Sequence, residues 1–205
     1  MIKVGFIVEG ATEFILLKSM SFNEFLKKNN IELVNVINAG GSGNLLPHNI
    51  ESYIQLLERN EAEKIVILTD LDQDLCITRT KNRIKSRPQD LLVIAVQQIE
   101  SWFLACTPAM RQLLKTDDFF FPLPEAERIP YQTINRLMVD HTGRGIGNNS
   151  AGKIKLIKRL LEQHELDLSI SAEHPSCPSV QYFIKTIAGL EVNGSISKKL
   201  TSQIK

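Results

Sequence analysis

Acidic side chains follow three apolar segments in the first half of the chain. Glu9 comes directly after the first of them, Asp70 and Asp72 follow another, and Glu100 stands close behind a third. Carboxylates that crowd together repel one another and are costly to bury unpaired, and a divalent cation relieves both penalties. Because every candidate ligand atom in this group is a carboxylate oxygen, the group favours Mg²⁺ or Mn²⁺. The pattern predicts a metal site if these segments end at one edge of a sheet.

The segments that carry these carboxylates have the apolar character of buried strands. Helical patterns separate them, at residues 12–28 and near 45–59. The four predicted strands cover residues 2–8, 32–38, 64–69 and 91–96. Near-continuous apolar strands that alternate with helices predict an α/β fold with a parallel sheet covered on both faces. Such sheets bind ligands at the carboxyl ends of their strands, where the acids stand.

The strand signal ends near residue 98. A proline-containing stretch at 117–130 predicts a loop, and the remaining segments have helical patterns, at 99–114, 131–139, 152–163 and 179–190. We therefore expect an α/β core over residues 1–98 and a helical extension over residues 99–205. We expect the two to pack as one compact unit.

The composition is that of a folded protein and gives no preference for a charged partner. The 205 residues are 43% hydrophobic and 23% charged, with a formal net charge of +1, which excludes an intrinsically disordered chain. No apolar run approaches the roughly 20 residues of a membrane-spanning helix, and the opening segment MIKVGFIVEG predicts a strand rather than a signal peptide. Three cysteines without a CxxC pair favour a reducing, cytoplasmic location.

Two short motifs carry a resemblance to a known domain. Val8-Glu9-Gly10-x-x-Glu13, together with Thr69-Asp70-x-Asp72, resembles the Toprim domain of topoisomerases, bacterial primases, recombination-repair proteins and OLD-family nucleases. Residues 98–105 (QIESWFLA) and Cys177-Pro178-Ser179 resemble, more specifically, a family of small bacterial Toprim-like proteins related to the OLD nucleases. The resemblance implies a Rossmann-like core with a mostly parallel four-stranded sheet, followed by a C-terminal helical extension.

The resemblance also implies roles for individual residues. In the Toprim fold the first Glu and the Asp-x-Asp pair bind Mg²⁺, or the Glu acts as general acid or base. OLD-like nucleases add a second acid four residues after the first, a further acid after the fourth strand, and a lysine that stabilises the pentacovalent phosphate. The implied ligands of one or two Mg²⁺ or Mn²⁺ ions are Glu9, Glu13, Asp70, Asp72 and Glu100, and the implied catalytic residues are Glu9 and Lys153.

A dense run of basic residues follows the Asp-x-Asp pair. Its five members stand at alternate positions: Arg79, Lys81, Arg83, Lys85 and Arg87. Such a run is commonly a solvated face, whereas beside a metal site it would contact the phosphate backbone of a nucleic acid. Lys155, in a second basic segment, is a further candidate for such a contact.

Two glycine-containing segments have to be weighed as phosphate-binding loops. Residues 147–153 match G-x-x-x-x-G-K, but Ile154 stands where a P-loop needs Ser or Thr, and no apolar strand precedes the segment. A P-loop is therefore disfavoured. Residues 40–44 open a predicted helix at the acidic edge, where a phosphate site and a plain turn both remain open.

These observations predict a Mg²⁺-dependent nuclease that hydrolyses phosphodiester bonds in DNA or RNA. The resemblance further implies an effector of a phage-defence system that works with a separately encoded ABC-type ATPase. The alternative is a non-catalytic Toprim-like module that binds nucleic acid or regulates another protein. Nucleic acid is the expected partner, a membrane is not, and a homo-oligomer is left open.

Overall fold

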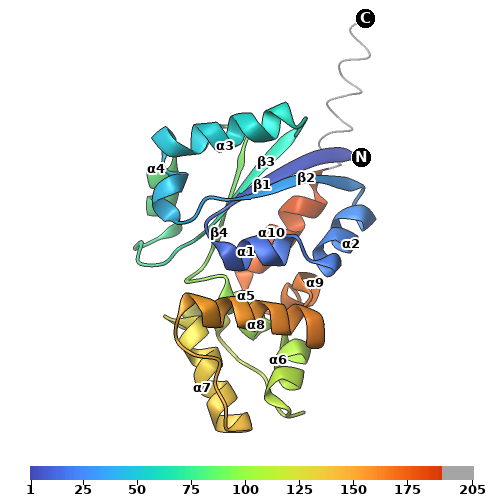
Figure 1. Cartoon of the computed structure of the whole chain (residues 1–205), viewed down its shortest axis with the longest axis vertical. Helices are drawn as coiled ribbons and strands as arrows, with labels where there is room; N and C mark the ends of the chain where they lie inside the picture. Colours follow the sequence, from blue (N-terminus) through green and yellow to red (C-terminus); the bar gives the residue numbers. More distant parts are fainter. Residues whose placement is uncertain (191–205) are drawn as a thin grey trace, which may run out of the picture.

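Four parallel strands form one sheet in the computed structural model of the chain, which describes residues 1–190 (Figure 1). Their order is β2-β1-β3-β4, and every neighbouring pair is parallel. The strands are β1 (Ile2–Val8), β2 (Ile31–Asn38), β3 (Lys64–Asp70) and β4 (Leu91–Ala95). The predicted strands and the α/β class are confirmed, and the sheet is Rossmann-like.

Helices cover both faces of the sheet, as the unbroken apolar strands predict. On one face Ile7, Ile65 and Ile67 pack under α3 (Pro47–Arg59) and α4 (Ile77–Ile84). Their neighbours in sequence point to the other face, because successive side chains of a strand alternate. There Phe6 and Leu68 join the larger core cluster, covered by α1 (Ala11–Leu17), α2 (Met20–Lys28) and α10 (Pro178–Ala188) (Figure 1).

Two predicted helices are each divided in the structure. The helix expected over 12–28 is broken between α1 and α2, where the Ser19 hydroxyl accepts a hydrogen bond from Phe22 N and begins the second helix. The segment expected over 99–114 forms α5 (Glu100–Ala105) and α6 (Thr107–Leu114), with Cys106 between them. The sequence pattern did not predict the short helix α9 (Leu168–Ser171) or two 3₁₀ turns, η1 (Ser42–Leu45) and η2 (Pro124–Ala126).

The strand order reverses direction at β1. The chain passes from β1 to β2 on one side and then returns to β3 on the other side. In an open parallel sheet this switch leaves a crevice between the carboxyl ends of the two central strands, and ligands bind there. Glu9 directly follows β1 and Asp70 is the last residue of β3.

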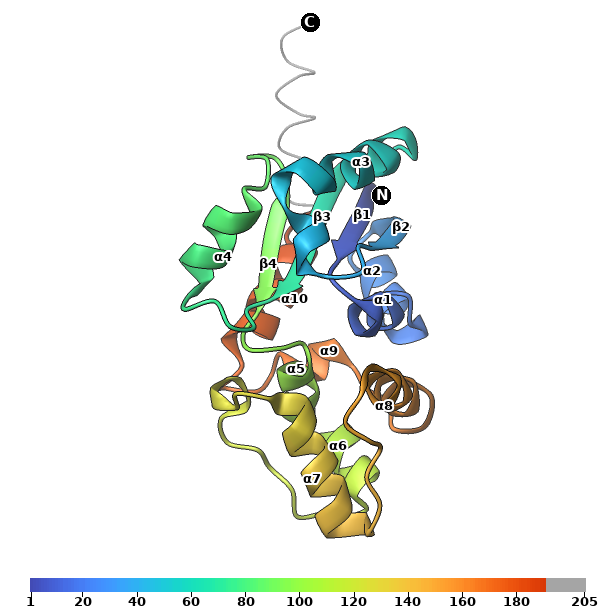
Figure 2. The ribbon, with the colours of Figure 1, turned by 60° about the vertical axis from the view of Figure 1, so that its left-hand side comes forward.

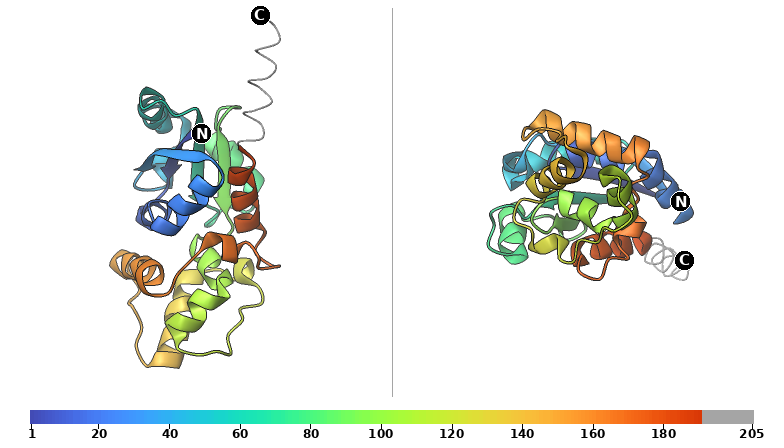
Figure 3. Two further views of the ribbon diagram at one scale, coloured as in Figure 1. Left: turned by 90° about the vertical axis from the view of Figure 1, so that its right-hand side faces the viewer. Right: turned by 90° about the horizontal axis from the view of Figure 1, so that it is seen from below.

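The helices after residue 98 lie mainly beyond the carboxyl ends of the strands. Figure 2 shows the strands ending above α5, α7 (Pro130–Thr142) and α8 (Ser150–Gln163). From there α10 returns to pack on the sheet beside β4, and the side view in Figure 3 shows it along the sheet. The part of the predicted helical extension that the structure describes, residues 99–190, therefore closes over the edge that carries the acids, and residues 191–205 of that extension lie outside the described residues. No helix within residues 1–190 is long and apolar enough to cross a membrane.

Candidate metal centre

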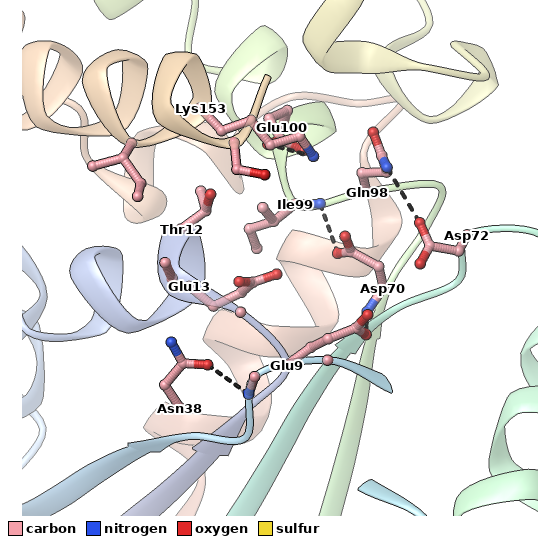
Figure 4. Close-up of a pocket in the computed structure, with 16 residues that line it drawn as sticks. Glu9, Thr12, Glu13, Asn38, Asp70, Asp72, Gln98, Ile99, Glu100 and Lys153 are labelled. Atoms are coloured by element: carbon pink, nitrogen blue, oxygen red, sulfur yellow. Dashed lines mark hydrogen bonds and ion pairs between the residues drawn. The ribbon is translucent and has the colours of Figure 1, made fainter. Parts of the chain in front are cut away.

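A cavity of about 440 Å³ lies at the switch point between β1 and β3 (Figure 4). All five carboxylates expected at a metal site line it, and so does the expected catalytic lysine: Glu9, Glu13, Asp70, Asp72, Glu100 and Lys153. They come from two strand ends, the loop after β3, and three helices. The fold thus brings together residues that are up to 144 positions apart in the sequence.

Glu9 and Asp70 are fixed by hydrogen bonds at the ends of adjacent strands. The Thr69 hydroxyl donates to Glu9 Oε2 at 2.6 Å, and Asp70 N donates to the same oxygen at 3.3 Å. Asp70 Oδ1 accepts a hydrogen bond of 2.8 Å from Ile99 N, at the start of α5. These bonds engage one oxygen of each carboxylate. Figure 4 shows the carboxylates of Glu9, Asp70 and Glu13 turned toward the same space.

Glu13 and Glu100 reach the cavity from helices and are more deeply buried. Their exposed fractions are 5% and 1%, respectively. Glu100 Oε1 lies 3.0 Å from the Nζ atom of Lys153, and Glu100 Oε2 has no hydrogen-bond partner among the described residues. A buried carboxylate with so few partners is expensive, and the ammonium group of Lys153 is the nearest compensation.

The crowding changes the protonation of these acids. Burial raises the pKa of Asp70 well above its usual value, and Glu13, Glu100 and other nearby carboxylates raise it further. Burial, helped by Glu100 and Glu9, raises the pKa of Glu13 to about 7. Burial also raises the pKa of Glu9. Strong pKa shifts among acids in one cavity are typical of functional sites.

Asp72 occupies the rim of the cavity and is exposed. Its backbone is left-handed, with φ of 48°, and its N–H donates to the carbonyl of Gln97, which is also left-handed with φ of 62°. Two such non-glycine residues in contact store backbone strain, which is concentrated at functional sites in many proteins. The Asp72 carboxylate accepts a hydrogen bond of 3.2 Å from Gln98 (Figure 4).

The donor set fits Mg²⁺ or Mn²⁺ in its chemistry, because all donors are oxygen atoms, most are buried, and they repel one another. The unpartnered Oε2 of Glu100 is a further sign that the site lacks positive charge. Within residues 1–190, however, no three acidic, histidine or cysteine side chains converge closely enough to hold one ion as they stand. Metal binding would therefore draw side chains together, and the exposed Asp72 has the freedom to turn inward.

Lys153 is positioned by the beginning of α8. Asn149 caps this helix by accepting a hydrogen bond of 2.9 Å from Gly152 N. The Lys153 ammonium lies 5.5 Å from the ring centroid of Tyr131, in a cation–π arrangement. Burial alone would lower the pKa of Lys153, but Glu100, and beyond it Asp70 and Glu13, raise it. The preceding loop follows a helix, α7, so the context that a P-loop requires is missing.

The basic run is divided between internal ion pairs and exposed side chains. Arg83 and Arg79 pair with Asp74, at 3.0 and 3.7 Å, and Arg87 lies 2.8 Å from both Asp90 and Glu58. The structure thus gives the three arginines intramolecular partners. The lysines proposed to contact nucleic acid are exposed: Lys81, Lys85 and Lys155.

The cavity also has lining residues for which the sequence analysis assigned no role. Gln98 and Ser150 are two of them. The glycine segment after β2, which the sequence left open as a phosphate site or a plain turn, adds Gly40 and Gly41 to the lining. These glycines have φ of 76° and 131°, which other residues rarely adopt, and Gly41 N donates to the Glu9 carbonyl at 2.8 Å. The glycine cluster was visible in the sequence. Gln98 was visible as the first residue of the motif QIESWFLA, but nothing in that motif gave it a role in the site.

Comparisons with known proteins give one distant structural match. No protein-family model matches the chain, and no curated protein matches its sequence. A solved structure, the C-terminal region of the Burkholderia pseudomallei OLD protein, aligns over 91% of this chain and 97% of that chain. The two are 17% identical, and the TM-score is 0.38. At this level of similarity, the function of the chain has to be argued from its own site.

Proposed function

We propose that this protein is a Mg²⁺- or Mn²⁺-dependent nuclease that hydrolyses phosphodiester bonds in DNA or RNA. The observation that carries the proposal is the grouping of five carboxylates and one lysine around a single cavity at the switch point of a parallel sheet. Such a group is unfavourable for folding, since burial and mutual repulsion raise the pKa of its members. A catalytic need for divalent cations explains why the chain carries it.

A bound divalent ion would polarise a phosphoryl oxygen and favour ionisation of a water molecule. Glu9 and Asp70 are the residues best placed to hold it, with Glu13 and Asp72 beside them. Glu9 would either bind the ion or, as the alternative role, accept a proton from the attacking water. Lys153 would stabilise the negative charge of the phosphate in the transition state.

The nucleic acid and protein partners belong to the same proposal. The exposed lysines Lys81, Lys85 and Lys155 are the candidates for direct phosphate contacts. The three arginines of the run, Arg79, Arg83 and Arg87, remain candidates that would exchange a carboxylate partner for phosphate. On the strength of the sequence resemblance alone, we include an ABC-type ATPase partner and a role in phage defence. We also propose residues 1–98 as the Toprim-like core.

One observation favours the alternative, a non-catalytic module that binds nucleic acid. The carboxylates are not preassembled into a metal-binding cage, and Glu100 is paired with Lys153. A protein that had lost metal-dependent activity would tolerate this arrangement. The alternative predicts binding of nucleic acid that does not depend on metal.

Cleavage by the full chain tests the two functions directly. Plasmid DNA and structured RNA would be incubated with the protein and Mg²⁺ or Mn²⁺, in the presence and absence of a candidate ATPase. We expect Asp70→Asn to lower the cleavage rate at least about 10²-fold, because it removes a carboxylate at the centre of the site. Asp118→Asn, on an exposed loop, is the matched control and should cut at the wild-type rate.

The outcomes separate the possibilities. Equal cutting by the wild type and Asp70→Asn would assign the activity to a contaminant. An absence of cutting, combined with metal-independent binding of nucleic acid, would favour the alternative. The fold of Asp70→Asn is checked by circular dichroism, and we expect it to be retained because the substitution relieves repulsion between buried carboxylates.

A further inference from the structure

The carboxylates of the cavity fall into two groups according to the elements that carry them. Glu9, Asp70 and Asp72 stand at the carboxyl ends of β1 and β3. Glu13 and Glu100 come from α1 and α5, and Figure 4 shows Glu100 set back beside Lys153. The second group already has a cation, since the Lys153 ammonium lies 3.0 Å from Glu100 Oε1.

Lys153 is held in this place by more than its charge. Its side chain is 31% exposed, against 1% for Glu100, so the ion pair is largely shielded from water. The Tyr131 ring stands 5.5 Å from the ammonium, and the Tyr131 hydroxyl donates to the carbonyl of Gly147, which fixes the ring. The neighbouring Lys155 and Lys158 are exposed and do not line the cavity.

We infer that the ammonium group of Lys153 takes the place of a second metal ion, so that the substrate-free protein binds one divalent ion per chain. This inference rests on the proposed function, because it requires that a first ion binds at Glu9 and Asp70. A second divalent ion between Glu13 and Glu100 would lie close to the ammonium and would be repelled by it. Displacing Lys153 would also remove the cation paired with the buried Glu100.

The inference assigns Glu100 a role different from that of a metal ligand. In the wild type, Glu100 holds Lys153 at the edge of the cavity, where the ammonium can reach a substrate phosphate. The unpartnered Oε2 of Glu100 becomes part of a second ion site only when Lys153 is removed. The number of bound ions therefore depends on one side chain and can be counted without any measurement of cleavage.

The experiment counts Mn²⁺ ions bound per full-length chain, by electron paramagnetic resonance of free Mn²⁺ during a titration. We expect one ion for the wild type and two for Lys153→Met, which keeps the length of the side chain and removes its charge. Lys158→Met, five residues along the same helix and exposed, is the matched control and should bind one ion. The double variant Lys153→Met/Glu100→Gln should return to one ion, because it lacks the carboxylate needed for the second.

Each outcome has a distinct meaning. Two ions in the wild type, or one ion in a folded Lys153→Met variant, would overturn the inference and leave the proposed function intact. No ion in the wild type at millimolar Mn²⁺ would instead contradict the proposed function itself. Circular dichroism of each variant establishes that it is folded. Glu100→Gln alone should still bind one ion, which keeps the inference testable if Lys153→Met does not fold.

Discussion

The acids of the cavity have environments that a structural role does not explain. A carboxylate that stabilises a fold has hydrogen bonds or ion pairs that lower its pKa, as Asp74 has with Thr80 and Arg83. Asp70 and Glu13 show the reverse, because burial and neighbouring carboxylates raise their pKa. The chain thus loses stability at these residues when they are ionised. That cost distinguishes this cavity from the ion pairs elsewhere in the protein.

The raised pKa of Glu13 predicts how stability changes with pH. The folded protein holds a proton on Glu13 up to pH of about 7, whereas the unfolded chain releases it near 4.5. Stability from this group is therefore present at low pH and lost as the pH rises through 7. Glu13→Gln cannot ionise, so the variant should match the wild type near pH 4.5 and be more stable at pH 8. The full difference is at most about 3 kcal/mol.

Urea unfolding of the metal-free proteins at several pH values measures this difference. Glu24→Gln, on the exposed side of α2, is the control and should follow the wild type throughout. Mg²⁺ should stabilise the wild type more at pH 8 than at pH 5.5, because metal ligands must be deprotonated. A constant offset between Glu13→Gln and the wild type at every pH would contradict the assignment of the titration to Glu13.

At the scale of elements, the start of α8 is fitted closely against the Tyr131 side chain and the loop that precedes the helix. A Cβ atom at Gly152 would lie 2.3 Å from the Tyr131 hydroxyl and 2.9 Å from the carbonyl oxygens of Gly147 and Ile146. Glycine is therefore required inside this first helical turn, where alanine would otherwise be preferred by about 1 kcal/mol. The close approach brings Lys153, the next residue, beside Tyr131 and over the cavity.

Gly152→Ala should destabilise the protein in spite of the higher helix propensity of alanine. We expect a loss of about 1–3 kcal/mol in the free energy of unfolding, because the new methyl group meets backbone atoms as well as the tyrosine. Gly43→Ala is the control, since a Cβ atom there meets nothing within 4 Å. Tyr131→Phe should recover part of the loss in a double-variant cycle. Equal stability of Gly152→Ala and the wild type would show that α8 can move away freely.

The sequence predicted the elements that carry the site better than the contacts within it. The apolar strands and the acids that follow them were sufficient to predict that Glu9 and Asp70 lie at one edge of a parallel sheet. The pattern could not show that Arg87 pairs with Glu58, 29 positions away, because such a contact depends on how α3 packs. Nor could it show that a left-handed backbone at Asp72 turns this carboxylate toward Gln98.

At the scale of the whole molecule, one aromatic stack joins α2, which covers the sheet, to α5 and α10. Trp102 of α5 stacks on Phe183 of α10, with ring centroids 5.2 Å apart, and Phe183 stacks on Phe22 of α2 at 5.8 Å. Ser179 accepts hydrogen bonds from Trp102 Nε1 at 2.7 Å and from Val96 N at 3.3 Å. The larger core cluster therefore includes residues on both sides of position 98, which supports one compact unit.

This shared core predicts that the chain unfolds in one cooperative step. The protein has a single tryptophan, and Trp102 is fully buried at the junction, so its fluorescence reports loss of the stack. Circular dichroism reports all the helices and strands. The two urea transitions should coincide, because the α/β core cannot keep its large cluster once α5 and α10 leave it.

Ser179→Ala leaves the buried indole N–H without an acceptor. We expect this substitution to lower the free energy of unfolding by about 1–3 kcal/mol and to shift the urea midpoints of both transitions together. A fluorescence transition that precedes the loss of ellipticity would instead show two units that unfold separately, with the metal centre formed between them.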